Sequence, residues 1–122
     1  MNTKANILIA EDDHQIRESL VEQLAHEKYN VTGAADGNEV IPKLYGKEYQ
    51  LLILDLKMPY IDGFDVLKFC KTTFPKTKIL VITAYSDAKN IELCKGLGAD
   101  EVISKPFELD FLLSLIHIMV GE

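Results

Sequence analysis

Four polar residues each follow an apolar run, and their chemical types suit the binding of a metal ion and a phosphate group. Asp12 comes after ANILIAE, Asp55 after LLIL, Thr83 after ILVI and Lys105 after EVIS. If these runs are parallel strands of one sheet, their carboxyl ends share an edge, where ligand sites of such sheets lie. We therefore expect two carboxylates, a hydroxyl and an ammonium group to meet in one crevice.

The acids of this set predict a metal site. Each alone is explained as a solvated loop acid or a helix cap, and Asp13 is well placed to cap the helix that follows it. In one crevice, however, the carboxylates of Glu11, Asp12 and Asp55 repel one another, which raises a carboxyl pKa unless a cation is present. Mg²⁺ prefers oxygen ligands and usually takes one or two carboxylates plus phosphate oxygens. The acids therefore indicate Mg²⁺ with a phosphoryl group as a further ligand.

The other two residues indicate where the phosphoryl group goes. Lys105, in SKPF, can pair with Asp55 at rest and with a phosphoryl oxygen after transfer, although alone it would be a surface charge. The Thr83 hydroxyl can donate to the same group, and the small Ala84 leaves room for entry. A carboxylate can attack phosphorus as a nucleophile. Transfer then needs in-line positioning and neutralisation of the equatorial oxygens.

The elements that must position these residues alternate along the whole chain. Near-continuous apolar runs are typical of strands covered on both faces, and segments of helical period separate them. Five strand–helix repeats predict a doubly wound α/β domain with a parallel sheet and right-handed crossovers. The predicted strands are 5–10, 29–34, 50–55, 78–82 and 101–104.

Helix signals fill the gaps between these strands. Asp62-Gly63 precedes the third helix, and Gly96 and Gly98 end the fourth. The second helix is weaker, and Pro42 is tolerable there only near the first turn. The last helix, about 107–120, has two adjacent apolar stripes, which indicate either contact with a partner, a second copy or a following domain, or broad burial. The stripes are Phe111, Leu115 and Ile118, and Leu112, Ile116 and Met119.

Composition narrows the class of protein. A chain of 122 residues fits one domain, 1–122, and 48% hydrophobic residues suffice for one core. A net charge of −6 argues against nucleic-acid contact by this domain. No apolar stretch reaches the roughly 18–20 residues of a membrane span, and no signal peptide is recognisable, so we expect a cytoplasmic protein. Cys70 and Cys94 are expected to be reduced, and His14, His26 and His117 to be surface imidazoles.

Together, ILIAEDD, LLILDLKMPYIDGFDVL, VITAY and SKPF resemble the receiver domain of two-component response regulators, over essentially the whole chain. The resemblance implies a flavodoxin-like five-stranded sheet of order 2-1-3-4-5 with five helices. It implies Asp55 as phosphoacceptor, Asp12 as direct metal ligand and Glu11 as a ligand through water. The Lys57 backbone carbonyl would be a further ligand. Thr83 would be the switch hydroxyl and Lys105 the phosphate-binding lysine, in a cis bond to Pro106.

The same resemblance implies roles for four tuning positions. Val102 stands where receivers commonly carry an aromatic residue that swings inward, so readout is expected to rely on the loop after Thr83 and the next helix. Lys57 and Tyr85 match positions that tune dephosphorylation, and their size predicts a long phosphoryl lifetime. Ala84 leaves the entrance open.

The resemblance also implies the partners and the class of activity. A sensor histidine kinase or a histidine phosphotransfer protein would donate the phosphoryl group. The domain would assist its own phosphorylation and dephosphorylation as a switch, without being a turnover enzyme. Its output surface would be the fourth helix, last strand and last helix, which would control a partner, a second copy or an attached output domain.

Three other classes of protein share part of this pattern. A phosphatase of the haloacid dehalogenase type needs a second Asp two residues after the nucleophile, where this chain has Lys57. A degenerate receiver, which never takes phosphate, would lack Asp55, Lys105 or the acidic pair, and all are present. A flavin carrier would need a hydroxyl- and glycine-rich phosphate loop after the first strand, which this sequence does not have.

Overall fold

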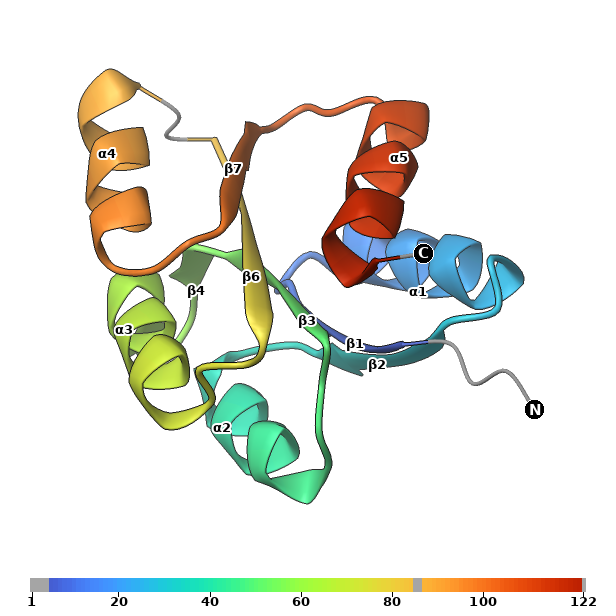
Figure 1. Ribbon diagram of the computed structural model, residues 1–122, viewed down its shortest axis with the longest axis horizontal. Coiled ribbons are helices and arrows are strands. Elements are labelled where there is room, and N and C mark those ends of the chain that lie inside the picture. Colours follow the sequence, from blue (N-terminus) through green and yellow to red (C-terminus); the bar gives the residue numbers. More distant parts are fainter. Residues whose placement is uncertain (1–4, 85–86, 122) are drawn as a thin grey trace.

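Alternating strands and helices build the predicted α/β sheet in the computed structural model, which describes residues 5–84 and 87–121 (Figure 1). Its five long strands start and end within one residue of prediction. They are β1 (Asn6–Ala10), β2 (Asn30–Ala34), β3 (Leu51–Asp55), β6 (Lys78–Thr83) and β7 (Glu101–Ser104). The helices are α1 (His14–His26), α2 (Gly37–Gly46), α3 (Gly63–Thr73), α4 (Ala88–Gly96) and α5 (Leu109–Val120).

The five long strands pair in parallel in the order β2-β1-β3-β6-β7. This is the predicted flavodoxin-like order 2-1-3-4-5, because β4 (Lys57–Met58) and β5 (Ile61–Asp62) form a separate two-stranded hairpin. The hairpin was not predicted. Two-residue strands are too short to carry a hydrophobic period.

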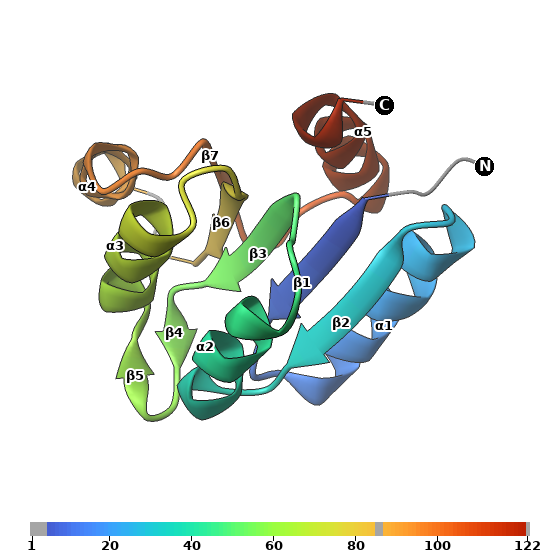
Figure 2. The ribbon, with the colours of Figure 1, turned by 60° about the horizontal axis from the view of Figure 1, so that its bottom comes forward.

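Two layers of helices cover the sheet (Figure 2). Leu20 and Leu24 of α1 pack with Leu112 and Ile116 of α5 in a core on one face. Residues of α2, α3 and α4 form the core on the other face. Both faces of the central strand β3 are covered, so all of its residues are buried. Within the described residues, no helix has the length and apolar character needed to cross a bilayer.

Some sequence predictions fail in detail. Pro42 lies in the interior of α2, beyond its first turn. Its ring is exposed, so water can reach the carbonyl that loses a helical hydrogen bond there. His117 is half-buried because its Nδ1 lies 2.6 Å from the Tyr29 hydroxyl and its Nε2 lies 3.1 Å from Glu27 Oε1. His14 and His26 are exposed as predicted.

Other predictions are confirmed. Asp13 caps α1 by accepting from the Ile16 N–H, and Asp62 caps α3. Gly98 has a φ of 114°, a left-handed value that glycine adopts without strain. The thiols of Cys70 and Cys94 are free and buried. On α5 one stripe is buried, whereas Phe111 and Ile118 of the other are 57% and 74% exposed.

Candidate functional site

The acids after β1 come to the sheet edge on a short loop that its own hydrogen bonds hold. Glu11 is buried, and its N–H donates to the Ala34 carbonyl of β2 (3.1 Å). Glu11 Oε2 accepts from the Asp13 N–H (3.1 Å). Asp12 lies between them and is exposed. The loop therefore presents one buried and one accessible carboxylate on the same side of the sheet.

Lys105 joins this loop to the end of β3. Its Nζ donates to Glu11 Oε1 at 2.7 Å and to Asp55 Oδ2 at 3.0 Å. The side chains of Glu11 and Asp55 are only 4% and 8% exposed. The predicted resting pair of Lys105 with Asp55 is present, and the bond to Glu11 is additional. The Lys105–Pro106 peptide is cis, as expected.

The electrostatics of this cluster depend on burial. Burial raises the pKa of Glu11 to about 7, although its hydrogen bond with Lys105 acts in the opposite direction. Burial alone would lower the pKa of Lys105, but its bonds to Glu11 and Asp55 outweigh this and raise it. The ammonium therefore stays charged at neutral pH, while Glu11 is poised between its protonated and ionised forms.

The arrangement fits a divalent cation. Carboxylate oxygens of Glu11, Asp12 and Asp55 lie within 4.8 Å of one another. When ionised, these three carboxylates and one ammonium leave two negative charges in a partly buried space. Oxygen donors and this charge match Mg²⁺, which would favour the ionised form of Glu11 against the burial that raises its pKa.

Beside the acids lies a hollow of about 360 Å³. Thr83, at the end of β6, is 1% exposed, and Ala84 is exposed beside it. The Lys57 N–H donates to Asp55 Oδ1 (3.0 Å), which orients the carboxylate. Lys105 and six other residues predicted to form the site therefore line one hollow. The lining residues are Glu11, Asp12, Asp13, Ile16, Asp55, Lys57, Thr83, Ala84 and Lys105.

Gly63 holds the chain beyond Asp55 close to the site. A Cβ on Gly63 would lie 2.4 Å from the Leu56 carbonyl oxygen, so no other residue fits without moving the backbone. The β4–β5 hairpin is thereby folded back beside Leu56. This explains why Asp62-Gly63 matters beyond starting α3.

The predicted tuning residue Val102 is not among the residues that line the hollow. Val102 lies half-buried in β7 and packs against the core beneath α2, α3 and α4. Tyr85 lies outside the described residues. Arg17 was not predicted to take part in the site, yet its guanidinium donates to the Glu11 carbonyl. The one sequence signal for Arg17 is its position, one helical turn after Asp13.

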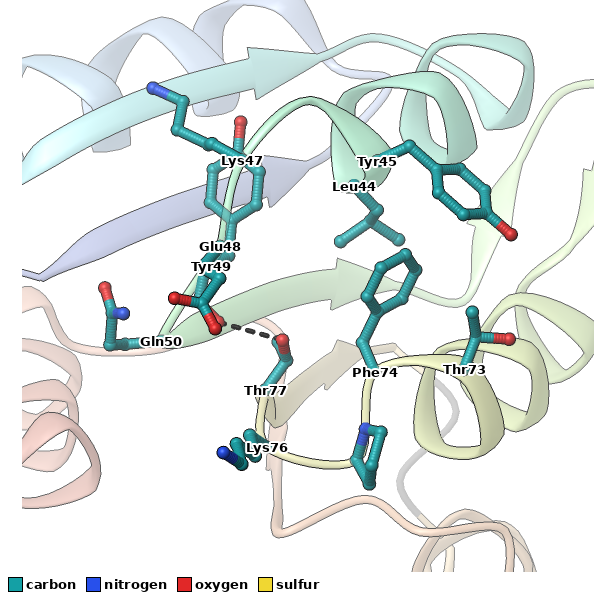
Figure 3. A pocket seen from close by; sticks show the side chains of 11 residues that line it. Leu44, Tyr45, Lys47, Glu48, Tyr49, Gln50, Thr73, Phe74, Lys76 and Thr77 are labelled. Carbon is teal, nitrogen blue, oxygen red and sulfur yellow. Dashed lines mark hydrogen bonds between the residues drawn. The ribbon is translucent and has the colours of Figure 1, made fainter.

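A larger groove, about 670 Å³, lies at the opposite edge of the sheet (Figure 3). Tyr45 and Phe74 meet there edge to face, with ring centroids 5.2 Å apart. The buried Thr77 hydroxyl donates to the Tyr49 carbonyl at 2.8 Å. This groove contains none of the residues predicted to bind metal or phosphate.

A family model and curated relatives match most of this chain. The chain matches the model of the response regulator receiver domain over residues 7–117. Response regulator ArlR of Staphylococcus aureus is 36% identical over 114 residues, which are 93% of this chain and 52% of that protein. The chain therefore spans about half the length of the curated relatives that it matches.

Solved structures give the same result for the fold. A CheY-like receiver domain protein from Methanospirillum hungatei superposes with a TM-score of 0.92 at 30% identity, covering 97% of this chain and 94% of that one. Chemotaxis protein CheY4 of Vibrio cholerae has a TM-score of 0.88 at 28% identity, covering 95% and 98%.

Proposed function

Because this chain belongs to the response regulator receiver domain family of two-component signalling, we propose that it is a Mg²⁺-dependent phosphoacceptor switch. One observation carries the proposal. Lys105 Nζ bridges Glu11 and Asp55, and oxygens of both acids lie within 4.8 Å of an oxygen of Asp12. The chemistry needed for phosphoryl transfer is therefore assembled in one hollow.

We assign the nucleophile to Asp55. One of its oxygens attacks the phosphorus of a phosphohistidine in line; the new P–O bond forms as the P–N bond breaks, and the imidazole leaves with that electron pair. The donor is a sensor histidine kinase or a histidine phosphotransfer protein. The Lys57 N–H holds the Asp55 carboxylate during approach.

Charge neutralisation comes from the residues around Asp55. Lys105 and Thr83 donate to the transferred group once it is in place. Mg²⁺, held by Glu11, Asp12, Asp55 and the Lys57 backbone carbonyl, would neutralise charge on the phosphoryl oxygens. The same groups assist later hydrolysis, so the domain acts on itself as a switch and does not turn over a substrate.

The switch follows from the partners that Lys105 and Thr83 exchange. Inverting a population from 1:99 to 99:1 takes about 5.5 kcal/mol of differential stabilisation. Charge-assisted hydrogen bonds contribute about 1.5–3 kcal/mol each, so two or three new bonds suffice. Thr83 pairs in register with Ser104 of β7. A shift of Thr83 is thereby passed to the surface formed by α4, β7 and α5.

Readout by an aromatic swing does not apply to this chain, because position 102 is a half-buried valine in β7. We assign readout to the loop after Thr83 and to α4. Val102→Ala should leave the phosphorylation-dependent output intact, measured as partner binding with beryllofluoride. Loss of output in this variant would contradict the assignment.

The exposed Phe111 and Ile118 on α5 support an output contact with a second copy or an attached output domain. Relatives about twice as long are consistent with an attached domain. The net charge of −6 argues against direct nucleic-acid contact, and we assign the protein to the cytoplasm. Sedimentation with and without beryllofluoride distinguishes a second copy from the other occupants.

Intact-mass measurement after incubation with acetyl phosphate and Mg²⁺ tests the function. We expect one added phosphoryl group, lost with EDTA and in Asp55→Asn. Asp62→Asn is the matched control, because it makes the same change nearby and asparagine still caps α3. Uptake that survives in Asp55→Asn would contradict the site. Failure of both acetyl phosphate uptake and beryllofluoride binding would favour a receiver that never takes phosphate.

A further inference from the structure

We propose that Arg17 is a positioning residue that holds the acidic loop in its metal-binding conformation. The inference rests on the proposed Mg²⁺-dependent function and concerns a side chain that lies outside the hollow. Arg17 is the only arginine in the chain. It is on α1, one helical turn after the acids, and its side chain is only 14% exposed.

Arg17 binds the backbone on both sides of Asp12. Its Nη1 donates to the Glu11 carbonyl at 2.9 Å, and its own N–H donates to the Asp13 carbonyl at 2.9 Å. The second guanidinium nitrogen lies 3.1 Å from His14 Nδ1. The bond to Asp13 is the first i→i−4 bond of α1 and does not depend on the side chain. The guanidinium therefore holds the Glu11 carbonyl, which belongs to the peptide that joins Glu11 to Asp12.

Asp12 depends on this backbone for its direction. Its side chain is exposed, and among the described contacts it forms no hydrogen bond or ion pair. The rotation of the peptide between Glu11 and Asp12 therefore decides where the Asp12 carboxylate lies relative to Asp55. Without the guanidinium, the Glu11 carbonyl can turn, and the three acidic oxygens no longer share one position for a cation.

Strand β2 makes room for the clamp at Gly33. A Cβ on Gly33 would lie 3.2 Å from Arg17 Cδ and 3.3 Å from Arg17 Cγ, so the Arg17 stem fills the space of the missing side chain. Gly33 is the fourth of the five residues of β2 (Asn30–Ala34), inside the strand, where glycine weakens it. The close approach of the Arg17 side chain explains why glycine occupies this position.

Titration calorimetry with Mg²⁺ tests the clamp in the intact chain. Arg17→Met keeps the apolar stem and removes the donors, and we expect Mg²⁺ affinity to fall about tenfold, as for other outer partners of metal ligands. Arg17→Lys keeps a donor and the charge, and should stay within about threefold of the parent. At saturating Mg²⁺, phosphoryl uptake by Arg17→Met should match the parent. A purely structural role would lower thermal stability in EDTA without changing Mg²⁺ affinity.

Gly33→Val tests the same clamp from the other side. Valine suits a strand better than glycine, yet it should weaken Mg²⁺ binding because it displaces the Arg17 stem. Combined with Arg17→Met it should add no further loss, since both changes remove one interaction. Parental Mg²⁺ affinity in Arg17→Met, or fully additive losses in the double variant, would overturn the inference. If the parent itself bound no Mg²⁺, the proposed function would fail first.

Discussion

A hollow lies at each edge of this sheet, one at the amino ends of the strands and one at the carboxyl ends. We assign metal and phosphoryl binding to the smaller of the two. At the amino edge the groove is about 670 Å³, and its buried Thr77 hydroxyl is satisfied by a backbone carbonyl. At the carboxyl edge the hollow is about 360 Å³, and the buried Glu11 and Asp55 share a single ammonium group. Buried charge, rather than volume, therefore distinguishes the edge to which we assign the function.

Parallel topology explains why the edges differ. Every helix begins at the carboxyl edge, where its first N–H groups and its positive end favour negatively charged partners. Aspartates cap four of these starts, at positions 13, 36, 62 and 87. Helices end at the amino edge, where the rings of Tyr45 and Phe74 meet edge to face at the ends of α2 and α3. Helix starts therefore favour negatively charged groups at the carboxyl edge.

The largest expected effect comes from removing the ammonium group at the carboxyl edge. Lys105→Met should slow phosphoryl uptake from acetyl phosphate about a hundredfold, comparable to losing one preorganised donor in an active site. Quench-flow mass measurements give the rate. Lys76→Met at the amino edge is the matched control and should match the parent. Equal uptake rates for the two variants would contradict the assignment of phosphoryl transfer to the carboxyl edge.

The second effect is a pH dependence specific to the carboxyl edge. With the pKa of Glu11 at about 7, Mg²⁺ must displace a proton below that pH, so affinity should be about tenfold lower at pH 6 than at pH 8. Calorimetry at both values measures it. Glu11→Gln should flatten this dependence; an unchanged slope in that variant would assign the proton to another group.

Without metal, the Glu11 carboxyl also makes the free energy of unfolding depend on pH. Stability falls as the pH rises, whereas Mg²⁺ affinity increases. The pKa of this carboxyl is raised from 4.5 to about 7, so the folded state holds the proton more tightly than the unfolded chain. Its contribution to stability is complete below pH 4.5 and is lost as the pH rises through about 7. Urea unfolding in EDTA should therefore show Glu11→Gln losing less stability than the parent between pH 5 and pH 8.

At the amino edge we expect a structural effect alone. Thr77→Val leaves the buried Tyr49 carbonyl without its donor, which should lower the free energy of unfolding by about 1–3 kcal/mol. Phosphoryl uptake should not change. The exposed Thr73 in the same groove provides the control, because Thr73→Val should stay within about 0.5 kcal/mol. If folded Thr77→Val lost phosphoryl uptake, the amino edge would also contribute to function, which would contradict this expectation.

The smallest effect concerns the lifetime of the phosphorylated state. Lys57 is exposed and lines the hollow, and we expect its side chain to hinder an attacking water. Lys57→Ala should shorten the lifetime of the Asp55 phosphate severalfold, followed by mass after removal of the donor. Lys68→Ala, an exposed position on α3, is the control. An unchanged lifetime would exclude Lys57 as a barrier.

What could be predicted from the sequence depended on the range of the interactions. Three of the long strands are near-continuous apolar runs, and all five were found within one residue because they alternate with segments of helical period. Parallel topology then brought Asp12, Asp55, Thr83 and Lys105 to one edge. The resemblance supplied the strand order and the cis bond of Lys105.

The missed features depend on contacts between distant segments. The Lys105–Glu11 bond joins residues 94 positions apart. The Arg17 clamp needs the space at Gly33 on another strand, and the half-buried His117 needs Tyr29, 88 positions away. A periodic pattern contains no information about such pairs.

Amide chemical-shift mapping during stepwise addition of Mg²⁺ and then beryllofluoride tests the central claim most directly. The account predicts shifts centred on residues 11–13, 55–57, 83 and 104–105, spreading to α4 and β7 with beryllofluoride. Gln50 and Thr77 at the amino edge should stay fixed. Shifts centred on the amino-edge groove, or none at the acids, would contradict the assignment of metal and phosphoryl binding to the carboxyl edge.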